Sequence, residues 1–127
     1  MKILWKKIRQ LNIKRDINQT KMDFYSVLIP TILSTEIFKR NEDIRELVEL
    51  FKVKISIKDY LYANRTALLA RLIREIQECD EKNLEYNIKQ FRKKTLSLIE
   101  EKGLINSSEV TEFINKYSRN KKVEINE

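Results

Sequence analysis

Apolar residues recur every three or four positions along most of this chain, which is the spacing of one face of an α-helix. In the first segment, Leu4, Ile8 and Leu11 share such a face. The pattern predicts successive helices over residues 2–14, 20–29, 41–51, 57–79, 81–102 and 108–117, with a short further helix at 35–39. The chain is therefore predicted to be all-α.

Polar residues and a single glycine mark the expected helix ends. Pro30 is predicted to stop the second helix, because proline lacks a backbone donor and clashes with the preceding turn. Ser56, with Asp59 three residues later, resembles a capping box and opens the longest helix. Asp80 caps the next helix, and Gly103 stands where a helix end favours a left-handed residue.

The longest predicted helix, residues 57–79, is interpreted as the centre of the fold. One face carries Leu61, Leu68, Leu69, Leu72, Ile73 and Ile76. The opposite face carries Ala63, Ala67 and Ala70, where a surface helix normally carries charge. Such small residues let a second helix approach closely, so we expect packing on both sides, within the monomer or against a second copy. The alternative is that alanine is simply a good surface helix former.

Arg65 falls in the middle of the leucine face of this helix. A guanidinium there must reach solvent or find a partner, because an unpaired buried charge is costly. One hypothesis is an internal ion pair; the other is a basic residue held inward for a ligand. The internal pair is favoured, because buried arginines are usually paired.

Two segments alternate with period two instead of following the helical pattern. They are residues 52–57 and 122–126, and their alternation allows a minor two-stranded β pairing on the helical body. The alternative, an extended linker and a disordered tail, is favoured because isolated two-stranded pairs are marginally stable.

These patterns predict a single compact bundle of five to six helices around a long central helix. Residues 1–118 form one helical domain, and residues 119–127 form a polar C-terminal tail. Having one glycine in 127 residues disfavours tight hairpins, which need positive φ at low cost. Cys79 has no second cysteine to pair with, and no apolar run is long enough to span a bilayer. Both observations favour a cytoplasmic protein.

Most catalytic chemistry lacks its usual residues in this sequence. The chain has no histidine, one glycine and one cysteine, which excludes histidine-based nucleophile activation, phosphate-binding glycine loops and the common metal-ligand spacings. The acidic neighbours Asp80 and Glu81 disfavour a reactive thiolate at Cys79. We therefore predict no catalytic residues, no metal site, no cofactor and no enzymatic activity.

One short segment is similar to a known family signature. Residues 107–114 resemble the Ser-Gln-Glu-Leu-Asp signature of small helical aspartyl-phosphate phosphatases from sporulating bacteria. The position of the signature's acidic residue is Thr111 here, so the resemblance implies no phosphatase activity for this chain.

Positive charge is the remaining functional signal. The chain has 26 Lys and Arg against 19 Asp and Glu, a net charge of +7. Cations fall along one flank of the helix over 81–102 and along a strip of the first helix. These candidate nucleic-acid-binding residues are Lys82, Lys89, Arg92, Lys93, Lys2, Lys6 and Arg9. Two basic strips on separate helices fit a phosphate backbone, although a general lysine-rich composition explains the same excess.

The leading functional prediction is a non-catalytic accessory factor or subunit of a nucleic-acid-handling assembly. It would contact the backbone without reading sequence, because no base-reading motif accompanies the cations. The alternative is a helical protein-binding module, such as an adaptor, inhibitor or immunity-type factor, with a protein partner or a homodimer through the long helix. A membrane-surface anchor formed by residues 1–14 ranks last, because that helix is short and its apolar face is narrow.

Overall fold

The computed structural model describes the backbone of residues 1–126 and the side chains of residues 1–116. Its helices are α1 (Lys2–Arg9), α2 (Ile17–Leu33), α3 (Arg45–Val48), α4 (Arg65–Glu78), α5 (Glu81–Glu101) and α6 (Ser107–Asn126), with short 3-10 helices η1 (Asn41–Ile44) and η2 (Asp59–Ala63). No strand occurs between residues 1 and 126, so the all-α prediction is confirmed.

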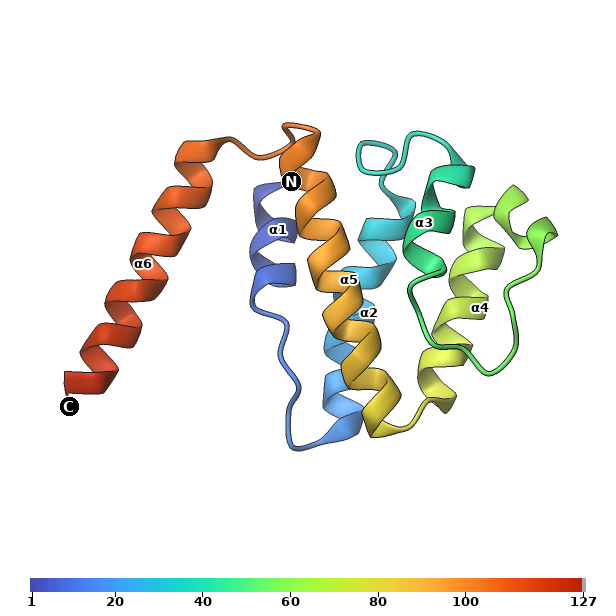
Figure 1. Ribbon diagram of the computed structural model, residues 1–127, viewed down its shortest axis with the longest axis horizontal. Helices are drawn as coiled ribbons and strands as arrows, with labels where there is room; N and C mark the ends of the chain where they lie inside the picture. The colour runs from blue at the N-terminus through green and yellow to red at the C-terminus, as the bar shows by residue number, and fades with distance from the viewer. Residues whose placement is uncertain (127) are drawn as a thin grey trace.

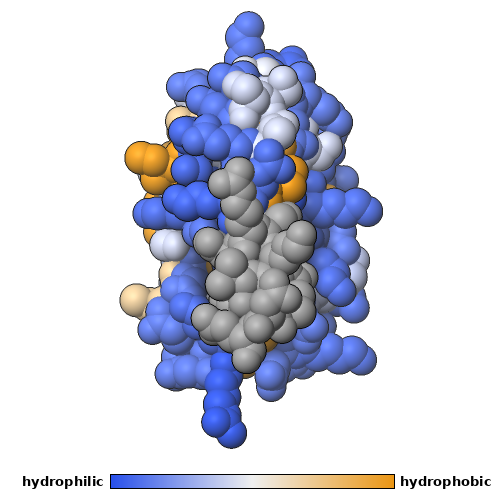
Figure 2. All heavy atoms as spheres, turned by 90° about the vertical axis from the view of Figure 1, so that its left-hand side faces the viewer, coloured by the Kyte–Doolittle hydropathy of each residue, from blue (hydrophilic) through white to orange (hydrophobic). Residues whose placement is uncertain are grey.

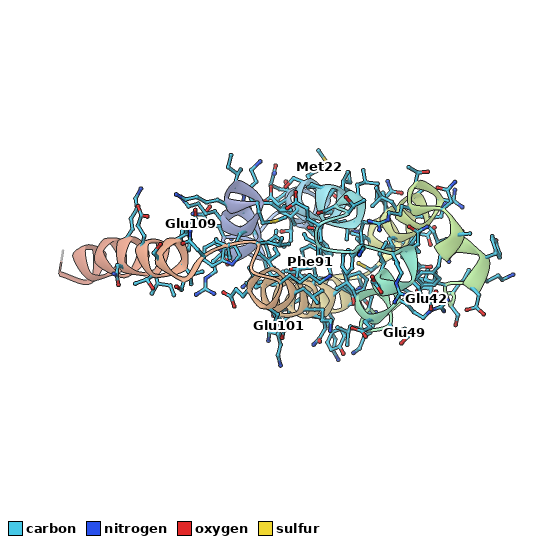
Figure 3. All side chains as sticks on the ribbon, turned by 90° about the horizontal axis from the view of Figure 1, so that it is seen from above. Met22, Glu42, Glu49, Phe91, Glu101 and Glu109 are labelled. Carbon is cyan, nitrogen blue, oxygen red and sulfur yellow. The ribbon has the colours of Figure 1, made fainter. Side chains whose placement is uncertain are left out.

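Helix α5 lies along the middle of the bundle, with α1 and α2 packed against it on one side and α3 on another (Figure 1). Helix α4 packs against α2 at one end of the molecule, whereas α6 extends away from the opposite end. Phe91 of α5 points into the middle of the bundle (Figure 3) and meets Phe24 of α2 edge to face, with ring centroids 5.2 Å apart. Both phenylalanines are fully buried.

The predicted long central helix over residues 57–79 is not found. Residues 59–63 form η2, and α4 begins only at Arg65 because Asn64 caps it. The Asn64 side chain accepts hydrogen bonds from the backbone N–H groups of Thr66 and Ala67, at 3.0 and 3.2 Å. Ala67 and Ala70 lie on an exposed face of α4, and Ala63, at the end of η2, is exposed as well. These alanines are surface helix formers here, and the predicted packing on both faces is wrong within this chain.

Helix α2 continues through Pro30 to Leu33, so the predicted stop at this proline is wrong. Pro30 lies in the last turn of α2, and the missing N–H affects only the carbonyl of Ser26, four residues earlier. Ser26 and Pro30 are both exposed, which leaves that carbonyl near water instead of buried. The cost of the proline is therefore low at this position.

The period-two segment after α3 is neither helix nor strand, and side chains of two helices pair with it instead of a second strand. The side-chain Oδ1 of Asn87 accepts from the Lys52 N–H at 2.8 Å, and its Nδ2 donates to the Lys52 carbonyl at 3.1 Å. The Glu75 carboxylate accepts from the Lys54 N–H at 3.0 Å. These bonds satisfy backbone groups that a neighbouring strand would otherwise satisfy. Residues 122–126, the other half of the proposed pairing, lie in α6.

Arg65 binds carbonyl oxygens instead of a carboxylate. Its Nη1 donates to the carbonyls of Ile32 and Ser34, each at 3.1 Å, and its Nη2 donates to the carbonyl of Phe38. Its Nε donates to Asn41 Oδ1 at 2.8 Å. Arg65 is therefore a structural residue that joins the start of α4 to the end of α2 and to the following turn.

Among the remaining helix ends, two predicted caps are confirmed and two predicted helix boundaries are wrong. Asp80 accepts from the Asn83 N–H at 2.8 Å at the start of α5, and Gly103 has a φ of 68° after its end, as predicted. Helix α1 ends at Arg9 instead of residue 14, and residues 35–39 contain a turn instead of a helix. Helix α6 runs across residue 118, where the sequence predicts that the domain ends and a tail begins. The domain boundary itself stays a prediction.

Candidate anion-binding groove

Helices α1 and α5 lie side by side, which brings together cations that are far apart in the sequence (Figure 1). Arg9, at the end of α1, lies close enough to Arg92 of α5 for its charge to perturb that guanidinium. Lys89 and Lys93 flank Arg92 on α5. The structure therefore joins one member of the predicted α1 strip to three members of the predicted α5 strip.

A groove of about 380 Å³ lies between α5 and the segment that follows α1. Residues 12–13 form one wall, and six α5 side chains complete the lining. The lining residues are Asn12, Ile13, Glu85, Ile88, Lys89, Arg92, Lys93 and Leu96. Three of them are cationic and one, Glu85, is acidic, so the groove is electropositive.

Arg92 is the half-buried cation of this groove. Its Nε is buried and has no hydrogen-bond partner within the described part of the chain. Burial lowers the pKa of Arg92 from its ordinary value, and the positive charge of Arg9 lowers it further. Both effects disfavour the charged guanidinium, and a bound anion would oppose both.

Arg9 is held beside Arg92 by stacking on Trp5. Its guanidinium carbon lies 5.5 Å from the centroid of the Trp5 ring, within the range of a cation–π contact. Trp5 is fully buried and packs edge to face on Phe113 of α6, with ring centroids 5.1 Å apart. An aromatic contact, without an ion pair to any acidic side chain among residues 1–116, therefore keeps Arg9 near the groove.

The candidate cations differ from many other cations of the molecule in being unpaired. Ion pairs in the described residues involve Lys14, Arg40, Arg45, Arg71 and Lys94. None of the seven predicted binding residues forms an ion pair there. Lys94 is a close comparison, because it lies on α5 beside Lys93 and is held by Glu46 at 3.2 Å. The seven candidate cations are therefore available to a ligand, as are other cations without an ion pair among the described residues, such as Lys54, Lys58 and Arg74.

Four of the predicted residues lie outside the groove lining: Arg9, which lies beside Arg92, and three more distant lysines. Lys2 and Lys6 are on the earlier turns of α1, and Lys82 is in the first turn of α5, before the lining begins at Glu85. Lys2 and Lys82 are exposed, whereas Lys6 is half-buried. They extend the basic surface beyond the groove on both helices.

Sequence reasoning missed Asn12 and Ile13 as parts of a site. The helical pattern through Leu11 placed both residues inside a helix over 2–14, whereas the helix ends at Arg9. Asn12 was the available signal, because asparagine favours turns over helix interiors. The early end of α1 is what leaves residues 12–13 free to form a wall.

Cys79, acidic clusters and a second hollow were the other candidates for a site. Burial raises the pKa of the Cys79 thiol, and its Sγ donates to the Ile76 carbonyl at 3.2 Å. No group of three acidic or cysteine side chains that could hold a metal ion occurs among the described residues. A second hollow beside α1 and α2 contains Lys14 and Asp23, which already pair at 2.8 Å.

The end of the molecule that carries α6 has a largely hydrophilic surface, with small apolar patches towards its edges (Figure 2). Within the described residues, none of the helices has both the length and the apolar character that a bilayer-crossing segment requires.

The fold and the groove define a small all-α protein with a concave basic surface between its first helix and its central helix. Comparisons with protein-family models, with curated proteins and with solved structures find no match to this chain. Its function is therefore inferred from the groove and its surroundings.

Proposed function

We propose that this protein is a non-catalytic accessory factor that binds the phosphate backbone of nucleic acid through α1 and α5. The observation that carries the proposal is the set of unpaired cations on these helices, with Arg9 and Arg92 held side by side and no acidic partner for either among the described residues. Backbone binding without sequence reading needs only such a surface.

The charge distribution supports a polyanion as the partner. Lys89, Arg92 and Lys93 line one groove and Arg9 lies beside Arg92, while Lys2 and Lys6 continue the positive charge along α1. A nucleic-acid strand presents phosphates at regular spacing and so contacts several of these cations at once. Each contact releases counterions, which makes such binding strongly dependent on salt.

The test is a titration of a fluorescent oligonucleotide at several salt concentrations. We expect the double variant Lys89→Gln/Lys93→Gln to weaken binding roughly tenfold, and to reduce the slope of log affinity against log salt by about 2, since each lost phosphate contact removes about one unit. The matched control is Lys54→Gln/Lys58→Gln, which removes the same charge from exposed positions away from α1 and α5. Equal weakening in both double variants, or no binding by the wild type at low salt, would refute the proposal.

The second candidate function, a protein-binding module, is favoured by the outer face of α2. Its exposed residues include the large apolar side chains of Met22, Ile29 and Leu33, and none of the exposed α2 residues is charged. The two charged residues of α2, Lys21 and Asp23, are half-buried and turned to neighbouring groups. Met22 points away from the bundle (Figure 3). Exposed large apolar side chains on one uncharged face are typical of a contact surface.

The occupant we propose for this face is a second copy of the chain. Two copies that each carry +7 repel one another, so they meet most readily through a face without charge. We expect sedimentation equilibrium to detect a dimer that persists at high salt and is lost in Met22→Glu. Ile55→Glu is the control, because Ile55 is equally exposed, at 63%, and lies outside α2. A wild-type protein that stays monomeric at all concentrations would exclude this occupant.

A further inference from the structure

We propose that the groove between residues 12–13 and α5 is a seat for a phosphate monoester that carries a nucleoside, as at the end of a nucleic-acid strand or in a free nucleotide. This inference rests on the proposed nucleic-acid binding and adds a preference for strand ends. The inference depends on three features of the groove: its positive charge, the unused hydrogen-bond donors of Arg92, and its apolar wall.

The charge around the groove suits a doubly charged anion. Lys89, Arg92 and Lys93 line it, Arg9 lies beside Arg92, and Glu85 is the one acidic lining residue. A phosphate monoester carries about −1.5 to −2 at neutral pH, whereas a backbone diester carries a single charge. Two adjacent guanidiniums without a carboxylate are therefore compensated better by a terminal phosphate than by an internal one.

The unused hydrogen-bond donors of Arg92 favour recognition of a compact oxyanion. Its terminal nitrogens make no hydrogen bond to any residue that the structure describes, and its buried Nε has no partner there either. Packing on α5 thus holds the guanidinium while its donors remain unused. An arginine fork of this kind can donate two parallel hydrogen bonds to phosphate oxygens.

The rest of the groove suits the nucleoside attached to that phosphate. Ile88 and Leu96 are buried below the opening, and Ile13 is 39% exposed at its edge. Asn12 adds an amide that can donate and accept hydrogen bonds. A volume of about 380 Å³ lies within the usual range for small-molecule pockets. Cations beside an apolar wall match a nucleotide better than they match inorganic phosphate alone.

The experiment compares one oligonucleotide sequence in three forms: with a 5′-phosphate, with a 3′-phosphate, and with hydroxyl groups at both ends. A nucleoside monophosphate and inorganic phosphate are titrated separately, by calorimetry. We expect at least one phosphorylated form to bind about tenfold more tightly than the hydroxyl form. We expect Arg92→Met to abolish this difference, by weakening the phosphorylated form about tenfold more than it weakens the hydroxyl form.

Lys94→Met is the matched control, because it removes one positive charge from α5 at a residue that Glu46 already holds. Lys93→Gln, at an exposed position, repeats the test should Arg92→Met fail to fold. Equal binding of all three oligonucleotides overturns the strand-end preference but leaves the proposed function intact. Binding of the nucleoside monophosphate with no binding of any oligonucleotide overturns the proposed function and supports a free nucleotide as the occupant. Loss of the preference in Lys94→Met as well as in Arg92→Met overturns the role of the groove.

Discussion

At the residue scale, Arg65 illustrates how a half-buried cation is stabilised without an ion pair. Three of its partners are backbone carbonyls and the fourth is the side-chain oxygen of Asn41. The carbonyls of Ile32 and Ser34 lie at the end of α2, where the helix dipole is negative and carbonyls lack partners within the helix. One side chain therefore satisfies several groups and secures the contact between α2 and α4.

Replacing Arg65 with methionine is expected to destabilise the fold by on the order of 3 kcal/mol, because it leaves buried carbonyl oxygens without donors. Denaturant unfolding of Arg65→Met measures this loss. Arg74→Met is the control on the same helix, since Arg74 is exposed and makes no ion pair within the described chain; we expect it to change stability by less than about 0.5 kcal/mol. Equal stability of the two variants would mean that Arg65 is not a structural anchor.

The position of Arg65 on the leucine face was evident from helical spacing, but its partners were not. A carboxylate was the expected partner because charge complementarity is visible in a sequence. Carbonyl partners depend on where a distant helix ends, and that end lies more than 30 positions away in the chain. The residue was therefore identifiable, while its role required the fold.

At the element scale, periodicity identified most helices and misplaced several of their ends. The seam of α5 and its caps followed directly from the sequence, since Asp80 and Gly103 act locally. The start of α4 did not, because Ser56 resembled a cap and Asn64 is the actual one. Both residue types favour helix starts, and only the tertiary position of the intervening segment distinguishes them.

The period-two segment after α3 shows a different limit of sequence patterns. Alternation distinguished this segment, which is neither helix nor strand, from the neighbouring helices, but it carries no information about what pairs with its backbone. Asn87 and Glu75, on two different helices, supply the hydrogen bonds. An isolated polar residue on the buried side of a helix was the available signal, since such residues need partners.

At the scale of the whole molecule, the candidate site arises from the packing of α1 against α5. The sequence placed cations on one flank of each helix, and seven of these residues are unpaired in the described structure. The contact between the two helices was not predictable from periodicity, which describes each helix separately. Neither was the approach of Arg9 to Arg92, which depends on the Trp5 ring beneath Arg9.

This packing holds like charges together, and it predicts that a multivalent anion stabilises the whole fold. Relief of the repulsion between Arg9 and Arg92 is available only in the folded state, where the two side chains are adjacent. A ligand at about ten times its dissociation constant stabilises the folded state by about 1.4 kcal/mol. For a domain of this size, such a gain raises the melting temperature by about 4 °C.

The measurement is thermal unfolding in pyrophosphate against sodium chloride of equal ionic strength. Wild-type protein and Lys94→Met should both be stabilised by pyrophosphate, because Lys94 is paired with Glu46 and lies outside the groove. In Arg92→Met, pyrophosphate should raise the melting temperature by less than about 1 °C. This variant lacks both the repulsion between Arg9 and Arg92 and the guanidinium donors that would bind the anion. An equal gain in all three proteins would assign the stabilisation to general exclusion of the salt from the protein surface, which acts on every folded state without a binding site.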